Sequence, residues 1–375
     1  MLTSFRSDLK PFEELARSFA ARELAKDVEE RDRHPFGEFS HGLLDKAFEV
    51  GFLGVVLPEK QGGIGGGIDT LCVILDTVCR TDSSLGGIIF TNALAHQVIL
   101  EAGGGALAGK AFRGASSAED FLVAFPAYSD PSRQDDLPVY TKSGRCFTLT
   151  GRVELLVLGG LARRALIPAR ADSGPSFSFF LVDLFDQRVE KSGPVFTLGL
   201  HSCPAVDVRM EGAGAGLIGE EGRGGEYYGR VSAKMHVAAA AMNAGIMKGS
   251  LDEALAYSRE RFQGGREIIG WSEVAMLLAG MTIKTNVADM CVAQACQVLE
   301  RGGPGSFSYC ISSALHVHEI ACETVTDGVQ ILGGNGYMKD YGQEKRFRDA
   351  RQVQALLGTV PMRKLGLIRR DRGLE

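Results

Sequence analysis

The spacing of hydrophobic residues divides the chain into three successive stretches. In residues 1–118 the apolar positions recur every three or four residues, as at Phe12 and Phe19, which predicts amphipathic helices. In residues 119–225 the apolar runs are short and separated by Gly, Pro, Asp and Ser, a pattern typical of a compact β domain. In residues 226–375 the helical period returns and continues almost to the end. We therefore predict an α+β chain of three domains with these limits.

The last stretch has the most regular pattern. Four long segments with a helical period follow one another, at 226–261, 268–300, 306–332 and 343–370. Long helices in direct succession indicate an antiparallel four-helix bundle.

Composition and charge narrow the class of protein. The 375 residues are 45% hydrophobic and 23% charged, which suits a globular chain with a large core. A net charge of −5 disfavours nucleic acid or an anionic membrane as the main partner. The eight cysteines include no C-x-x-C spacing, so we expect no metal site. No run reaches the roughly 20 apolar residues of a membrane helix, and the N-terminus is unlike a signal peptide, so we expect a cytoplasmic protein without a membrane span.

Four segments resemble one known family. They read VQILGGNGYMKDYGQEKRFRDARQVQALLGT at 329–359, SLDEALAYSRERFQGGREI at 250–268, GLIGEEGRGGEYY at 216–228 and FGEFSHGLLDKAFEVGFLGVVLPEKQGGIGG at 36–66. On these segments the chain resembles the acyl-CoA dehydrogenase family, in the correct order and over nearly its whole length. The resemblance implies an N-terminal helical domain, a middle β-barrel-like domain and a C-terminal four-helix bundle.

The resemblance also implies a chemistry. Family members are homotetramers, or dimers of dimers, that bind FAD between subunits and desaturate the α,β bond of acyl-CoA thioesters. A carboxylate removes the α proton while the flavin accepts the β hydride, and the electrons usually pass to an electron-transfer flavoprotein. The base must lie within hydrogen-bond reach and be unprotonated, and donors at the thioester carbonyl stabilise the developing enolate.

Part of the implied FAD site is present. The positions that match the family's FAD contacts are Arg261, Gln263, Gln330, Gly333, Gly334, Gly358 and Thr359. Arg261 matches an arginine that reaches the FAD diphosphate of a neighbouring subunit, where a planar, permanently charged guanidinium is suited; an ordinary exposed helix arginine would give the same pattern. Gly333 and Gly334 match glycines that approach FAD closely, and a plain helix end and turn would look alike. Ser129 matches a serine that contacts CoA.

The usual catalytic base is absent. The family glutamate that directly precedes Gly-Thr is replaced by Leu357. Some members carry the base on the first bundle helix instead, and ungapped alignment places Met235 there, with His236 in place of the neighbouring family arginine. His236 is the nearest titratable candidate for a base. A lone histidine on an Ala-rich helix is more often a packing residue.

The β-domain contacts with the flavin are also replaced. Leu155, Leu156 and Val157 stand where the family has Trp-Ile-Ser/Thr, so neither the stacking indole nor the hydroxyl is present. Ala124 and Phe125 stand where the family has Thr/Ser-Glu before a proline.

Two functions follow from this mixture. The first is a flavoprotein oxidoreductase that acts on an unidentified acyl-CoA thioester, by desaturation or by a related reaction that needs no base. The second is a non-catalytic subunit that pairs with a catalytic homologue in a mixed tetramer and lends Arg261 and Gln330 to the partner's FAD. The acyl group, the electron acceptor and the choice between a homomer and a heteromer are not readable from the sequence.

Overall fold

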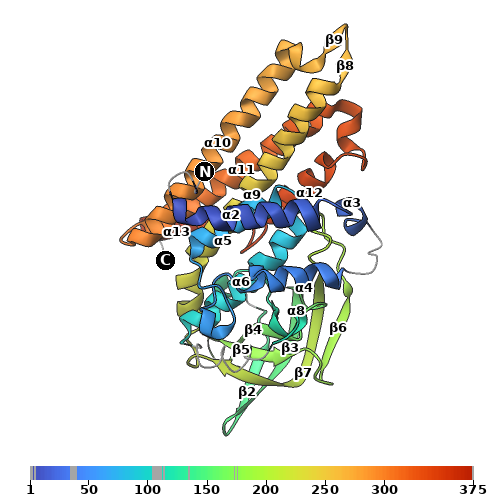
Figure 1. Ribbon diagram of the computed structural model, residues 1–375. Coiled ribbons are helices and arrows are strands. Elements are labelled where there is room, and N and C mark those ends of the chain that lie inside the picture. The colour runs from blue at the N-terminus through green and yellow to red at the C-terminus, as the bar shows by residue number, and fades with distance from the viewer. Residues whose placement is uncertain are drawn as a thin grey trace.

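The computed structural model describes residues 3, 6–33, 40–103, 112, 115–133, 136–172, 174 and 176–373. The first four residues of the 36–66 motif therefore lie outside the described residues. Figure 1 shows a long helical bundle at one end, a β sheet at the other, and the N-terminal helices between them.

The N-terminal part is helical, as the sequence predicts. Its helices are α2 (Lys10–Phe19), α3 (Val28–Arg31), α4 (His41–Glu49), α5 (Ile68–Cys79), α6 (Ser83–Glu101) and α8 (Ala118–Phe121), with short turns η1 (Ser7–Leu9), η2 (Ala20–Leu24), η3 (Phe52–Gly54) and η4 (Glu59–Gln61). Among the described residues, α6 is the helix long and apolar enough to cross a membrane, but 89% of its apolar window is buried inside the protein. A core helix has this character, because its whole circumference packs against protein.

The middle part forms a sheet that closes on itself. Its strands are β1 (Val123–Ala124), β2 (Val139–Ser143), β3 (Cys146–Val157), β4 (Arg164–Arg170), β5 (Phe177–Asp183), β6 (Val189–Pro194) and β7 (Ala205–Ile218). The order is β1-β4-β2-β3-β7-β5, β5 also pairs with β4, and β6 pairs with β7. The ring of β4, β2, β3, β7 and β5 leaves few open edges, which confirms the barrel-like architecture.

The C-terminal part is the bundle. Its elements are α9 (Gly224–Glu260), the hairpin of β8 (Phe262–Gln263) and β9 (Arg266–Glu267), η6 (Ile268–Gly270), α10 (Ser272–Arg301), α11 (Ser306–Leu332), η7 (Gly333–Tyr337), α12 (Gln343–Val353) and α13 (Val360–Arg372). The single helix predicted over 343–370 is therefore two helices. The chain turns at Leu357 and Gly358, whose φ angles of +63° and +105° are incompatible with a continuous right-handed helix.

The change from helix to strand and back falls near the predicted domain limits. Helix α8 begins at Ala118, β7 ends at Ile218, and α9 begins at Gly224. The limits 1–118, 119–225 and 226–375 themselves remain a prediction.

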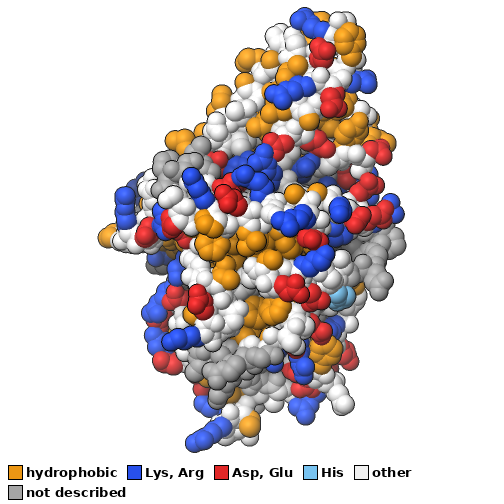
Figure 2. All heavy atoms as spheres, in the orientation of Figure 1, with side chains coloured by type: hydrophobic (Ala, Val, Ile, Leu, Met, Phe, Trp, Pro, Cys, Tyr) orange, Lys and Arg blue, Asp and Glu red, His pale blue; other side chains and the backbone are white. Residues whose placement is uncertain are grey.

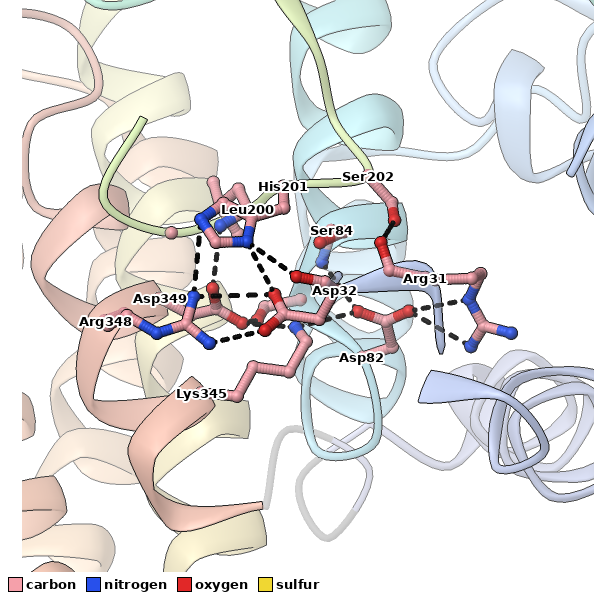
Figure 3. Close-up of polar contacts among 12 residues, drawn as sticks. Arg31, Asp32, Asp82, Ser84, Leu200, His201, Ser202, Lys345, Arg348 and Asp349 are labelled. Atoms are coloured by element: carbon pink, nitrogen blue, oxygen red, sulfur yellow. Dashed lines mark hydrogen bonds and ion pairs between the residues drawn. The ribbon is translucent and has the colours of Figure 1, made fainter. Parts of the chain in front are cut away.

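A buried carboxylate ties the three parts together (Figure 3). Asp349 on α12 is fully buried and accepts hydrogen bonds from Lys345 Nζ at 2.5 Å, Ser83 Oγ at 2.5 Å and the Leu200 N–H at 2.7 Å. Lys345 Nζ also lies 3.1 Å from Asp82 Oδ1. Ser83 begins α6 and Leu200 lies between β6 and β7, so the N-terminal helices, the sheet and the bundle meet at one side chain. A buried charge of this kind is tolerated only because it is fully paired.

A second carboxylate, Asp32, completes the network. Its side chain forms an ion pair with Arg348, and its Oδ1 lies 3.2 Å from His201 Nδ1. Burial acts to raise the pKa of Asp32, but His201, Lys345 and Arg348 outweigh it and lower the pKa to about 2. Burial acts to lower the pKa of His201, yet its hydrogen bonds and charge interaction with Asp32 raise the pKa overall.

Candidate functional site

The residue at the family's base position, Leu357, lies in the link between α12 and α13. Its side chain is 1% exposed, and its backbone is left-handed. Its N–H donates to the Ala127 carbonyl at 2.8 Å. A residue with a Cβ in this region costs about 1–2 kcal/mol, so the surrounding packing must hold it there. The hydrocarbon side chain cannot accept a proton, and the N–H is already used within the chain.

The two β segments that would face the flavin close on each other. The Phe125 N–H donates to the Val157 carbonyl at 3.1 Å, and the Val157 N–H donates to the Phe125 carbonyl at 3.1 Å. The side chains of Ala124, Phe125, Leu156 and Val157 are at most 1% exposed. We call these four residues the closed strip. The backbone groups of Phe125 and Val157 satisfy each other, and all four side chains are buried as in a protein core.

The backbone beside the closed strip keeps an unusual shape. Leu155 and Leu158 have φ angles of +52° and +66°, in the same left-handed region as Leu357. Strained backbone on non-glycine residues is concentrated at functional sites. We call the region formed by the closed strip, the Leu357 link, Ser129 and the His236 turn of α9 the junction. The backbone of the junction is strained at Leu155, Leu158 and Leu357, and these side chains are apolar.

The candidates on α9 are both buried. Met235 is fully buried, and His236 is nearly so. Arg363 Nη1 on α13 lies 3.4 Å from His236 Nδ1. Burial, then the charges of Arg363 and His318, hold the pKa of His236 well below its usual value. A neutral imidazole whose Nδ1 faces a guanidinium donor is poorly suited to accept a proton.

The remaining junction residues surround the end of the Leu357 link. Ser129 Oγ donates to the Pro126 carbonyl at 2.9 Å. Gly358 has φ +105°, which favours glycine, and a Cβ there would meet Asp130 at 3.8 Å. Thr359 is exposed and extended, and it directly precedes α13. The structure therefore brings Ser129, Gly358 and Thr359 near Leu357.

The other predicted FAD residues lie at the end of the bundle that carries the β8–β9 hairpin (Figure 1). We call this group, Arg261, Gln263, Gln330, Gly333 and Gly334, the bundle tip. All five are exposed. Among the described residues, the Arg261 guanidinium has no hydrogen-bond or ion-pair partner. A Cβ at Gly333, whose φ is +57°, would meet nothing within 4 Å. Within the described part of the chain, the tip thus offers an unpaired guanidinium at Arg261 and open backbone at Gly333.

The two halves of the bundle tip are held together within the chain. Asn335 Nδ2, in the turn after Gly334, donates to Tyr257 OH at 2.9 Å, one helical turn before Arg261. From Met235 to Glu260 the helix α9 rises about 1.5 Å per residue, so the tip lies about 37 Å from the junction along the helix. The bundle tip and the residues around Leu357 are therefore two separate groups on one chain, and the residues of the tip are exposed.

FAD suits one of these groups and not the other. The exposed Arg261 and the open Gly333 backbone fit a contact with a diphosphate on another molecule, since a guanidinium pairs with such oxygens in a bidentate manner. The closed strip fits an isoalloxazine ring poorly, because its buried side chains are apolar and the backbone groups of Phe125 and Val157 already pair with each other.

One residue of the junction was not predicted from the sequence. Arg363, on the first turn of α13, is 7% exposed and reaches into the space beside His236, where the family arginine on the first bundle helix is replaced. Five arginines or lysines follow Gly-Thr within α13, and nothing in their spacing marks Arg363 as the buried one.

Comparisons with known proteins agree with this architecture. Residues 7–117 match the model of the acyl-CoA dehydrogenase N-terminal domain, and residues 224–370 match that of the acyl-CoA dehydrogenase C-terminal domain. The chain is 27% identical to CarC, a subunit of the caffeyl-CoA reductase-Etf complex of Acetobacterium woodii, over 96% of this chain and 97% of that protein.

Solved structures show the same fold. Butyryl-CoA dehydrogenase of Megasphaera elsdenii aligns with a TM-score of 0.86 at 23% identity, over 95% of this chain and 96% of that one. An acyl-CoA dehydrogenase of Bacillus anthracis, solved in complex with FAD, aligns with a TM-score of 0.84 at 22% identity, over 98% of this chain and 68% of that one. The two domain matches, which flank the barrel, establish that the chain belongs to the acyl-CoA dehydrogenase family, a family of flavoprotein oxidoreductases.

Proposed function

We propose that this chain serves as a subunit of an FAD-dependent oxidoreductase that acts on an acyl-CoA thioester, and that it contacts FAD without abstracting the α proton itself. Family membership supports the reaction class and the cofactor. The proposal that another chain abstracts the proton rests on one observation, which is the pairing of Phe125 with Val157 beside a buried Leu357.

In the arrangement that we favour, this chain contributes FAD contacts to a neighbouring catalytic subunit. The bundle tip, with Arg261 unpartnered among the described residues and Gly333 open, would meet the diphosphate of FAD held by a homologous catalytic chain. The catalytic chain would supply the carboxylate base and the flavin-facing polar groups that are replaced here. CarC belongs to a complex that includes an electron-transfer flavoprotein, and we propose an electron acceptor of that class for the assembly.

The surface of the bundle suits a tetramer, homomeric or heteromeric. Met276, Ile283 and Met290 on α10 are 73%, 62% and 61% exposed and lie seven residues apart, so they form one stripe along the helix. Figure 2 shows hydrophobic side chains along this outer edge and at the tip, where Phe262 and Tyr337 are also exposed. Exposed apolar side chains that repeat along one face of a helix are typical of a protein interface. We propose a cytoplasmic location on the composition of the chain alone.

A second candidate is an enzyme that turns over its thioester without the usual base. What favours it is the strained backbone at Leu155, Leu158 and Leu357, together with the polar pair of His236 and Arg363 beside Leu357. On this reading the closed strip opens when FAD binds, and a thioester reduces the flavin of the isolated chain.

The test is the flavin content of the natural assembly. The tagged chain is purified from its own organism, and the FAD content and co-purifying homologous chains are measured for the wild type and for Arg261→Gln. We expect a homologous chain and bound FAD in the wild type, with FAD weakened in the variant while the chains stay associated. Arg259→Gln, at an exposed arginine two residues earlier, is the control and should retain FAD. An assembly without a homologous chain, or Arg261→Gln with unchanged FAD affinity, would contradict the lending role.

A further inference from the structure

A small cavity opens between α9, α11 and α13. It measures about 90 Å³ and is lined by Tyr228, Ser232, His236, Ile311, Leu357 and Arg363, among others. This volume accommodates a few water molecules or one small oxyanion.

Arg363 is the unusual feature of this cavity. Its side chain is 7% exposed. Nη2 donates to the Gln354 carbonyl, Nη1 lies 3.4 Å from His236 Nδ1, and Nε has no partner. No carboxylate among the described residues forms an ion pair with it. Burial lowers the pKa of Arg363 to about 10, which still leaves it charged at neutral pH.

Another buried cation in the same chain, Lys345, is paired with opposite charges. Lys345 is also 7% exposed, and its ammonium contacts Asp82 at 3.1 Å and Asp349 at 2.5 Å. Removing a charge from water is unfavourable unless an opposite charge accompanies it. The residues that the structure describes supply that opposite charge to Lys345 and supply none to Arg363.

The groups around Arg363 are also incompletely satisfied. Asn243 Nδ2 donates to His318 Nδ1 at 2.8 Å, which leaves His318 Nε2 and Asn243 Oδ1 buried without partners. Burial and the charge of Arg363 hold the pKa of His318 well below its usual value. Both histidines are thus neutral and bring no counter-charge. The unpartnered atoms, which are the nitrogens Arg363 Nε and His318 Nε2 and the acceptor Asn243 Oδ1, belong to residues of α13, α11 and α9.

The charged groups at the mouth of the cavity do not neutralise Arg363. Asp130 also lines the cavity, but its Oδ1 accepts from the Ser132 N–H at 3.0 Å, and it does not perturb the pKa of Arg363. Arg370, on the last turn of α13, is exposed and lies over the Phe307 ring. The net charge of the cavity is therefore positive at its buried end.

We propose that this cavity binds an oxyanion of carboxylate size, with the Arg363 guanidinium as its principal donor. A guanidinium presents two parallel N–H groups to a planar carboxylate and adds the missing opposite charge, whereas water supplies hydrogen bonds only. The anion is either free or the terminal carboxylate of an acyl-CoA. Binding needs neither FAD nor turnover, so it stands apart from the proposed function.

The test is a thermal unfolding titration of the purified chain in a buffer without small oxyanions. Acetate is expected to raise the Tm of the wild type in a concentration-dependent manner, because it binds the folded state alone. Arg363→Met should lose this response and, without anion, unfold no earlier than the wild type, since an unpaired buried charge has been removed. Arg369→Met, an exposed neighbour on α13, should respond as the wild type does. If Arg363→Met does not fold, Arg363→Lys replaces it and should respond more weakly.

Two further ligands identify the source of the carboxylate. A response to succinyl-CoA that butyryl-CoA and acetate do not give assigns the site to an acyl-linked carboxylate, and a response to acetate assigns it to a free anion. Absence of a response to all three, or equal responses in the wild type and in Arg363→Met, would overturn the proposal.

Discussion

Replacing Val157 by threonine tests whether the closed strip has the character of core. The two side chains are nearly equal in shape, so the change adds one hydroxyl to a side chain that is 1% exposed. The neighbouring backbone partners are already used, since the Val157 amide and carbonyl both pair with Phe125. A buried hydroxyl without a hydrogen bond costs roughly 1–3 kcal/mol, so we expect Val157→Thr to lower the free energy of unfolding by about 2 kcal/mol.

The assay is urea unfolding, compared with a matched change in the same sheet. Val182 on β5 is fully buried, and Val182→Thr should lose a similar amount. A shift of the urea midpoint at unchanged slope reports stability alone. If Val182→Thr loses about 2 kcal/mol while Val157→Thr loses less than about 0.5 kcal/mol, a polar or hydrated space adjoins Val157. That result would refute the closed strip.

The remaining predictions concern the network and the bundle surface. Asp349→Ala strands Lys345 and the Leu200 N–H, so we expect a loss of about 3–5 kcal/mol in the free energy of unfolding by urea titration, with a smaller loss for Asp349→Asn. The pKa of Asp32 is lowered from 3.8 to about 2, so its contribution of about 2 kcal/mol to the free energy of unfolding should be complete above pH 3.8 and disappear as the pH falls towards 2. The pKa of His201 is raised from 6.5, so its contribution should be complete below pH 6.5 and disappear as the pH rises through the folded pKa. Urea titrations of the wild type and of His201→Gln at pH 5 and pH 8 should therefore differ most at pH 5. Ile283→Glu should reduce the oligomer mass in sedimentation without lowering monomer stability, and an unchanged mass would contradict the α10 interface.

The architecture was readable from the sequence because the periods differ so clearly. The helical period before residue 118 and after 226 and the short apolar runs between them gave the order of helices, barrel and bundle. Strand β6, at Val189–Pro194, is not predicted by this pattern, because it is mostly exposed and lacks an apolar run. The break at Leu357 was missed as well, because a leucine carries no signal for a left-handed backbone and a single glycine is tolerated within a helix.

The chemistry of the site was only partly readable. The sequence showed that Leu357 replaces an acid and that Val157 replaces a hydroxyl residue. It could not show that Phe125 and Val157 pair with each other, since this contact depends on tertiary structure. It also could not distinguish Arg363 from the exposed arginines of α13, because burial of a cation there is decided by the helices packed against it.

The most direct test of the central claim is the flavin content of the isolated chain. The chain is expressed alone, and FAD is measured by its visible spectrum and by release on denaturation. We predict far less than one FAD per chain and no bleaching by acyl-CoA thioesters, with FAD present only when a homologous catalytic chain is co-expressed. One tightly bound FAD per isolated chain, reduced by a thioester, would contradict the account.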